Sequence, residues 1–151
     1  MTTKIWEMSA LQAHRLLKRR KISAKEILES CIKRIEEVDG TLNALPEKCF
    51  DRAKEFALRI DKNSSQRSQT NLLGLPIAVK DYNDLSGVRT TYGSTIFRNN
   101  IPEYSDRTIK ILESNGANPV AKSNVPEWAG GHTFNPVNGL TRNPWDVSKS
   151  A

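Results

Sequence analysis

The sequence has few residues of the kinds that build metal sites and disulfide frameworks. It holds two cysteines, Cys31 and Cys49, and two histidines, His14 and His132. Two cysteines make no disulfide framework and show no metal-binding spacing, and neither histidine has a ligand three or four positions further on. We therefore expect no metal and no other cofactor. Cys31 falls on an apolar helix face, which predicts a small buried hydrophobe.

Long apolar runs are also absent. No stretch approaches the roughly 18 consecutive apolar residues of a transmembrane helix. The first residues, MTTKIWE, lack the apolar core of a signal peptide. We expect a soluble protein of a reducing cytoplasm, with no membrane partner.

Several common enzyme motifs are missing as well. GxGxxG and GxxxxGK[ST] do not occur, so nothing specific supports nucleotide phosphate binding. The GxSxG elbow is absent too, although a Ser-His-Asp arrangement of distant residues stays open.

The formal net charge of +6 permits an anionic partner without demanding one. Much of the excess lies in residues 15–21, which hold five basic side chains. Basic residues favour the last turn of a helix, and no aromatic residue lies between Met8 and Cys49, as a nucleic-acid surface would favour. We therefore interpret this cluster as a solvated helix end and expect no nucleic-acid partner. A nucleic-acid-binding domain is the alternative.

The first part of the chain, residues 1–61, has the patterns of helices. Capping boxes open one helix at Ser9 and another at Ser23, and the second continues as an apolar stripe from Ile27 to Val38 that Gly40 is expected to end. A third helix follows Pro46, with apolar positions Phe50, Ala53, Ala57 and Ile60.

The rest of the chain has a different pattern. Residues 62–71 predict a solvated loop, the least ordered internal segment. Residues 72–151 predict the start of an α/β core: a strand over 72–79, a helix capped by Ser105 and Asp106 that ends at Asn115, and a strand over 118–121. Because 151 residues match one ordinary domain, we expect a single α/β domain, with N-terminal helices followed by a mixed sheet covered by helices. From Gly130 on the sequence has almost no periodicity, and no helix or strand is expected to close it.

Two lysines end the two predicted strands, Lys80 in GLPIAVKD and Lys122 in PVAKSN. The carboxyl ends of sheet strands are where α/β proteins place their ligands. A lysine at such a point has two interpretations. Either its side chain reaches water, or burial shifts its pKa for chemistry.

The sequence around these lysines resembles that of the amidase signature family. The similarity runs through LLGLPIAVKDYNDLSGVRTTYGS and then AKSNVPEWAGGHTFNPVNGLTRNPWD, over residues 72–146. It rests on a G-x-P-x-x-x-K-D block, a K-x-N-x-P-E block and a T-R-N-P-W-D block in the family's order.

The resemblance implies hydrolysis of carbon–nitrogen bonds in a small-molecule amide by a Ser-cisSer-Lys triad. On this pattern Lys80 is the general base, kept neutral by burial, and Asp81 is a structural neighbour. Ala129, Gly130 and Gly131 resemble the family's substrate-contacting loop. Lys122 matches a recurrent lysine that we expect to be structural.

One departure from the family pattern matters for function. In the family, a glycine- and serine-rich run follows the tryptophan-aspartate block and holds the cis-serine, with the nucleophilic serine further on. This sequence ends at Ala151, where that run would begin. We therefore expect an amino-terminal fragment of an amidase domain that is inactive by itself, with Trp128, Phe134 and Trp145 partly uncovered.

Other functions stay open at this stage. One is the glutaminase subunit of a transfer-RNA-dependent amidotransferase, although the EWAGGHTFNPVNG stretch favours a general amidase. Another is a non-catalytic remnant that serves as an interaction module. The N-terminal helices are a candidate contact for a homodimer.

Overall fold

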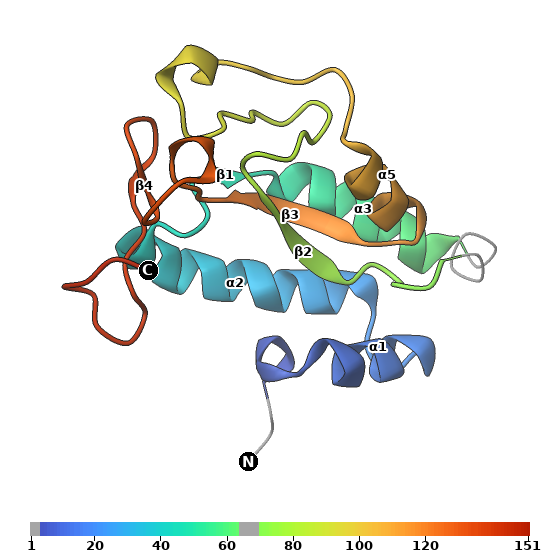
Figure 1. The fold of residues 1–151 in the computed structure, drawn as a ribbon. Coiled ribbons are helices and arrows are strands. Elements are labelled where there is room, and N and C mark those ends of the chain that lie inside the picture. The colour runs from blue at the N-terminus through green and yellow to red at the C-terminus, as the bar shows by residue number, and fades with distance from the viewer. Residues whose placement is uncertain (1–3, 64–69) are drawn as a thin grey trace.

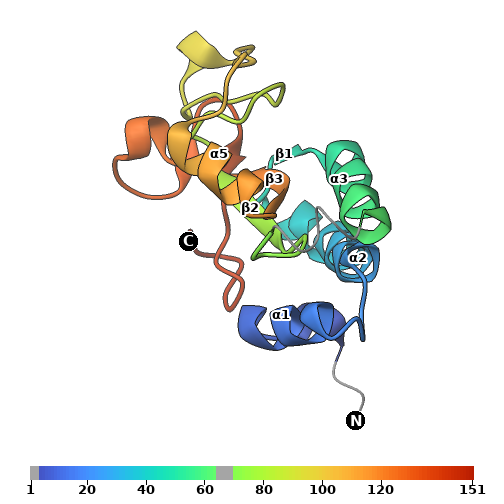
Figure 2. The same cartoon turned by 90° about the vertical axis from the view of Figure 1, so that its right-hand side faces the viewer.

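A computed structural model describes residues 4–63 and 70–151. Its helices are α1 (Ala10–Lys18), α2 (Ala24–Leu42), α3 (Phe50–Lys62) and α5 (Arg107–Ser114), with 3₁₀ turns η1 (Ile5–Glu7), η2 (Thr95–Phe97) and η3 (Glu127–Ala129). Its strands are β1 (Glu47–Lys48), β2 (Pro76–Lys80), β3 (Asn118–Ser123), β4 (Phe134–Asn135) and β5 (Gly139–Leu140). Helices α2 and α3 cover one side of the sheet, α5 lies on the other, and α1 packs below α2 (Figures 1 and 2). The predicted α/β class is confirmed.

Both predicted capping boxes are present. The Ser9 hydroxyl accepts a hydrogen bond from the Gln12 amide, and Gln12 accepts one in return from the Ser9 amide. Ser23 and Glu26 form the same reciprocal pair at the start of α2. Each box satisfies amides that the first helical turn leaves without an intrahelical partner.

The predicted end of the second helix is wrong. Gly40 lies inside α2, which continues to Leu42 and ends at Asn43 in the left-handed conformation, with φ of 52°. Asparagine tolerates this conformation, and here its side-chain amide also donates to the backbone oxygens of Asn138 and Leu140. The end is therefore set by a tertiary contact that a local glycine pattern does not show.

The main sheet has the strand order β1-β3-β2, with β1 antiparallel and β2 parallel to β3. The strand β1 has two residues and was not predicted. Strand β2 begins at Pro76 rather than at residue 72, because Leu73 and Gly74 have positive φ values that break the extended backbone. Among the described strands, β2 forms an outer edge of this sheet.

Apolar side chains fill the space between the layers. The largest buried group joins α2 and α3 to β3, and a second joins α5 to β2. The first includes Leu28, Ile32, Phe56, Ile60 and Val120, and the second includes Val79, Leu85, Val88 and Ile109. Cys31 is half-buried beside Leu17 and Ile27, and this burial raises the pKa of its thiol. Cys31 thus packs against the core as a small apolar residue, but it is less buried than the sequence predicted.

The predicted cap of α5 is only partly correct. Asp106 occupies the N-cap position, but its side chain makes no capping hydrogen bond. It accepts instead from the Asn83 side chain and from the Asp84 backbone amide, while the Ser105 hydroxyl accepts from the Ser86 amide. These two residues therefore hold the segment that follows β2 rather than capping the helix.

The segment from Gly130 on contains a short hairpin, β4 paired with β5, that the sequence did not predict. After Leu140 the described residues form no further helix or strand, in agreement with the expected end of the chain. The aromatic side chains expected to be uncovered are exposed: Trp128 by 58%, Phe134 by 57% and Trp145 by 95%. Leu73, Val79 and other core residues are buried at the same time, so this exposure is local.

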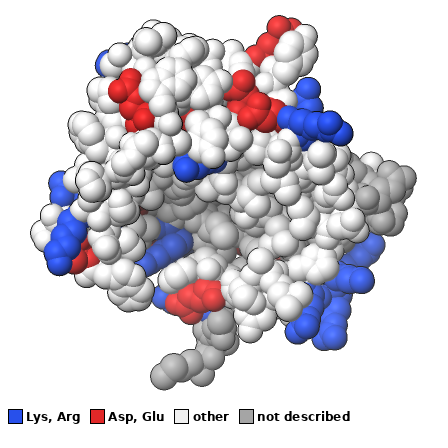
Figure 3. Space-filling model, viewed as in Figure 1, with Lys and Arg blue, Asp and Glu red and all other residues white. Residues whose placement is uncertain are grey.

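Two sequence predictions concern the surface. Lys62 belongs to α3, and the predicted loop beyond it lies largely in residues 64–69, outside the described residues. Arg15 and Lys18 lie in the last turn of α1, and Lys and Arg side chains gather beside this helix end in Figure 3. The helix-end interpretation of the basic cluster is therefore confirmed.

No helix in the described ranges is long and apolar enough to cross a membrane.

Candidate active site

Lys80 is the last residue of β2 and its side chain is exposed. Its amine lies 4.8 Å from the centre of the Tyr82 ring. Within residues 4–63 and 70–151, no carboxylate forms an ion pair with it. The described residues therefore do not supply the burial that the family resemblance implies for Lys80, and its role as a base stays a prediction.

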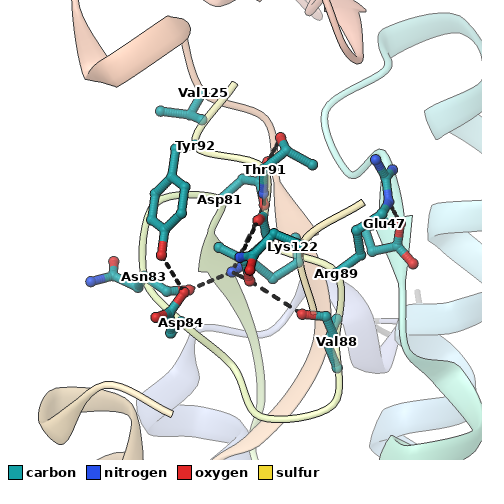
Figure 4. Close-up of polar contacts among 12 residues, drawn as sticks. Glu47, Asp81, Asn83, Asp84, Val88, Arg89, Thr91, Tyr92, Lys122 and Val125 are labelled. Carbon is teal, nitrogen blue, oxygen red and sulfur yellow. Dashed lines mark hydrogen bonds and ion pairs between the residues drawn. The ribbon is translucent and has the colours of Figure 1, made fainter. Parts of the chain in front are cut away.

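Lys122, in contrast, is fully buried on β3. Its amine donates to the backbone oxygen of Asn83 and, over 2.8 Å, to the hydroxyl of Thr90. It also lies 3.9 Å from Oδ1 of Asp81 (Figure 4). A buried ammonium is costly unless it is paired and hydrogen-bonded, and Lys122 has both kinds of partner.

Asp81 is the buried carboxylate that directly follows Lys80. Its two oxygens accept hydrogen bonds from Thr91, one from the amide at 3.1 Å and one from the hydroxyl at 2.5 Å. Its backbone amide donates to Ser123 and its carbonyl accepts from the Tyr92 amide. Asp81 is thus bonded to nearby backbone, which is compatible with the structural role that the family resemblance implies for it.

Burial dominates the electrostatics of this pair. It lowers the pKa of Lys122 to about 8, although Asp81, Asp84 and Asp106 act in the opposite direction. Burial also raises the pKa of Asp81, against the hydrogen bonds from Thr91. Both shifts favour the neutral forms, so removal from water outweighs the mutual attraction of the two charges.

A second layer of polar contacts surrounds the pair. The Tyr92 hydroxyl donates to Asp84 over 2.6 Å, and burial together with this bond raises the pKa of Tyr92 to about 12. Figure 4 shows Asn83, Asp84 and Tyr92 on one side of Lys122. Asp106 accepts from both Asn83 and Asp84, which connects this layer to the start of α5.

The predicted substrate loop begins at Ala129, the last residue of η3, and is exposed at Ala129, Gly130 and Gly131. Trp128 and Ala129 both have positive φ, at 53° and 62°, which non-glycine residues adopt rarely. The Trp128 ring stacks on Tyr92 with centroids 5.9 Å apart, and its amide donates to the Tyr92 carbonyl. These contacts hold the loop in its strained conformation.

Tyr92 connects the two parts of the site that the sequence predicted separately. Its amide binds the carbonyl of Asp81, next to Lys80, and its carbonyl binds the amide of Trp128, next to Ala129. Sequence reasoning missed Tyr92, because nothing in a single sequence marks a residue that works through its backbone.

The lysines do not occupy corresponding positions. Val79 is the register partner of Lys122, and Lys80 is the partner of Ser123. A shift of one residue places two side chains on opposite faces of a sheet, which explains why one lysine is buried and the other exposed. Strand register was the signal that the sequence lacked. No group of three potential metal ligands occurs within residues 4–63 and 70–151.

Comparison with known proteins connects this geometry to a family. A family model described as Amidase matches residues 26–151. A relative from Dehalococcoides mccartyi (strain CBDB1), named as a subunit of glutamyl-tRNA(Gln) amidotransferase, is 34% identical over 148 residues, which cover 97% of this chain and 30% of the relative. This chain thus spans about 30% of the length of the curated relative.

Solved structures of amidases also resemble the fold of this chain. A bacterial aryl acylamidase of the amidase signature enzymes superposes with a TM-score of 0.85 and 26% identity, over 96% of this chain and 31% of that one. A protein described as an amidase superposes with a TM-score of 0.83 and 32% identity, over 95% of this chain and 33% of that one.

Proposed function

Since this chain belongs to the amidase signature family, we propose that it supplies Lys80 as the general base of a site that hydrolyses amides. The observation that carries the proposal is the position of Lys80. It stands exposed at the carboxyl end of a parallel strand, in the family's G-x-P-x-x-x-K-D block, where α/β proteins place reacting groups.

The surroundings of Lys80 suit a base in one respect. A lysine accepts a proton only when its amine is neutral, and a paired carboxylate would hold it charged. No such partner occurs among the described residues, because the adjacent Asp81 turns inward to Thr91 and Lys122. The Lys80 side chain is exposed among the described residues, so a working base also needs cover that excludes water.

On this proposal Lys80 takes a proton through the cis-serine from the nucleophilic serine, whose oxygen attacks the amide carbon. The proton then goes to the leaving amine, and water releases the acyl group. Neither serine is assigned within residues 1–151, so on this proposal both lie in the part of the protein that follows residue 151. Ala129, Gly130 and Gly131 would face the acyl part of a small-molecule amide.

A second candidate function is that of an amidotransferase component. The observation in its favour is the relative at 34% identity, which carries that name. On the family resemblance, the sequence EWAGGHTFNPVNG of residues 127–139 favours a general amidase, so we propose that function first. Ammonia release from glutamine that depends on misacylated transfer RNA would favour the second candidate, and hydrolysis of a simple aryl amide without RNA would favour the first.

The experiment that tests Lys80 compares two lysines of similar surroundings in the protein that carries the chain beyond residue 151. Lys80→Ala should lower kcat by about 10²–10⁴-fold on a simple aromatic or aliphatic amide, the range typical of general-base loss. Lys110→Ala is the matched control, because Lys110 is exposed and lies 5.4 Å from the Tyr104 ring. Its activity should equal that of the wild type. If Lys80→Ala keeps more than about a tenth of the activity, Lys80 is not the base.

A further inference from the structure

The buried Lys122 side chain contacts the turn that begins at Lys80 from inside the protein. The Lys80 carbonyl accepts a hydrogen bond of 2.9 Å from the Asn83 amide, which closes a turn over residues 80–83. The Asn83 carbonyl in turn accepts from the Lys122 amine. Lys122 therefore binds the far end of the same turn that begins with Lys80.

Lys122 also contacts the middle of this turn and the segment that packs against it. Asp81 lies in the turn, 3.9 Å from the Lys122 amine, and Thr90 on the returning segment accepts from that amine. The Lys122 amine thus connects the turn over residues 80–83 to the segment that contains Thr90. Lys122 itself belongs to β3, which lies between β1 and β2 in the sheet.

The Lys80 side chain depends on this turn for its direction. Its neighbour in space is the ring of Tyr82, a residue of the same turn. The conformation of the turn therefore sets where the ring lies and where the Lys80 amine rests on it. The turn has other contacts as well: Thr91, Tyr92 and Ser123 bind Asp81. Asp106 binds the Asn83 side chain and the Asp84 amide. Lys122 is the buried side chain that reaches the Asn83 carbonyl, at the end of the turn.

We propose that Lys122 is a positioning residue for Lys80: its buried amine fixes the turn over residues 80–83 and thereby the direction of the Lys80 side chain. The catalytic part of this inference rests on the proposed function, whereas the geometric part does not. A purely structural Lys122 would stabilise the whole domain without a specific effect on Lys80.

The first test needs no activity. In the 151-residue chain, nuclear magnetic resonance should show ring-current shifts of the side-chain protons of Lys80, from Tyr82, and of Lys110, from Tyr104. Lys122→Met keeps the side-chain volume but removes the donor. We expect it to abolish most of the Lys80 shift and to leave the Lys110 shift unchanged. The matched variant Lys110→Met should leave the Lys80 shift intact.

A milder variant covers the case in which Lys122→Met does not fold. Thr90→Val has nearly the same shape and removes one acceptor of the Lys122 amine. We expect a partial loss of the Lys80 shift with the Lys110 shift retained. An unchanged Lys80 shift in a folded variant overturns the inference, and so does loss of both shifts in both variants, because Lys122 is then a residue of global stability.

The second test uses the protein with the chain beyond residue 151. There Lys122→Met should lower kcat by about 10²-fold, the effect of a misplacement of about 1 Å, with KM unchanged. Lys110→Met should have wild-type kcat and KM. An active Lys80→Ala variant would refute the proposed function and leave the resonance result standing. A retained Lys80 shift in Lys122→Met, with Lys80→Ala inactive, would refute only this inference.

Discussion

Lys80 and Lys122 lie one register position apart at the ends of paired parallel strands, and their side chains point to opposite faces of the sheet. Lys122 shares a face with Val79, its register partner, which is 2% exposed. Lys80 shares the other face with Ala78, which is exposed. The same residue type therefore has two environments, one fixed by hydrogen bonds in the interior and one open to solvent.

The first prediction concerns the pH dependence of stability. The pKa of Lys122 is about 8 in the folded chain against 10.5 for an ordinary lysine, so between these values the unfolded chain binds more protons. The contribution of Lys122 to the free energy of unfolding then rises with pH, by at most about 1.4 kcal/mol per pH unit. Lys122→Met lacks this group. In urea unfolding from pH 8 to 10.5, wild-type stability minus variant stability should increase; a constant difference would contradict the pKa shift.

The second prediction concerns Gly74, which precedes β2. A Cβ atom there would lie 2.6 Å from the Cβ of Ala24 at the start of α2, and its φ is +87°. Gly74→Ala should lower the free energy of unfolding by about 2–5 kcal/mol, through strain and contact together. Gly87→Ala is the control, since φ is +72° and no atom lies within 4 Å. It should cost about 1–2 kcal/mol. Equal losses would show that the contact with Ala24 is unimportant.

The third prediction concerns Asp39 near the end of α2. Its buried carboxylate accepts from the amides of Ala44 and Leu45 through one oxygen and from the Lys48 amine through the other. Asp39→Ala leaves two amides unpaired and should cost about 2–4 kcal/mol in thermal or urea unfolding. Asp39→Asn keeps an acceptor for both amides and loses only a pair with a partly exposed lysine, worth about 1 kcal/mol at most. Similar losses for the two variants would show that the hydrogen bonds from the Ala44 and Leu45 amides do not account for the stabilising effect of Asp39.

The fourth prediction concerns the 151-residue chain by itself. On the family resemblance its nucleophilic serine lies outside these residues, and covalent acyl transfer needs a serine placed beside its base and its oxyanion donors. We expect no amide hydrolysis and no labelling by a fluorophosphonate probe. Labelling that disappears when a serine of this chain is replaced would show that the nucleophile lies within it.

The sequence predicted those parts of the fold that depend on local chemistry. The capping boxes at Ser9 and Ser23 and the apolar stripe after Ile27 act within one or two helical turns, and the structure confirms them. The end of α2 at Asn43 could not be predicted, because its contacts with Asn138 and Leu140 lie far along the chain.

In the candidate site, too, the sequence predicted what depends on local patterns and missed what depends on long-range contacts. The block around Lys80 located the relevant strand end. The burial of Lys122 depends on register, and the link through Tyr92 depends on backbone groups that every residue carries. Strand register and backbone hydrogen bonds cannot be recognised from residue types or their spacing. The sequence therefore predicted a structural role for Lys122 without showing which segments its amine contacts.

Among the strands that the structure describes, β2 lies at an edge of the sheet, which has a consequence for the behaviour of the chain in solution. Backbone groups on the outer side of an edge strand can pair with another molecule, and natural proteins guard such edges with proline and lysine. In β2, Pro76 stands at one end and Lys80 at the other, with only Ile77, Ala78 and Val79 between them. We therefore expect the charge of Lys80 to discourage self-association as well. Lys80→Ala removes one of two gatekeepers and should form fibrillar or larger assemblies at lower concentration than the wild type.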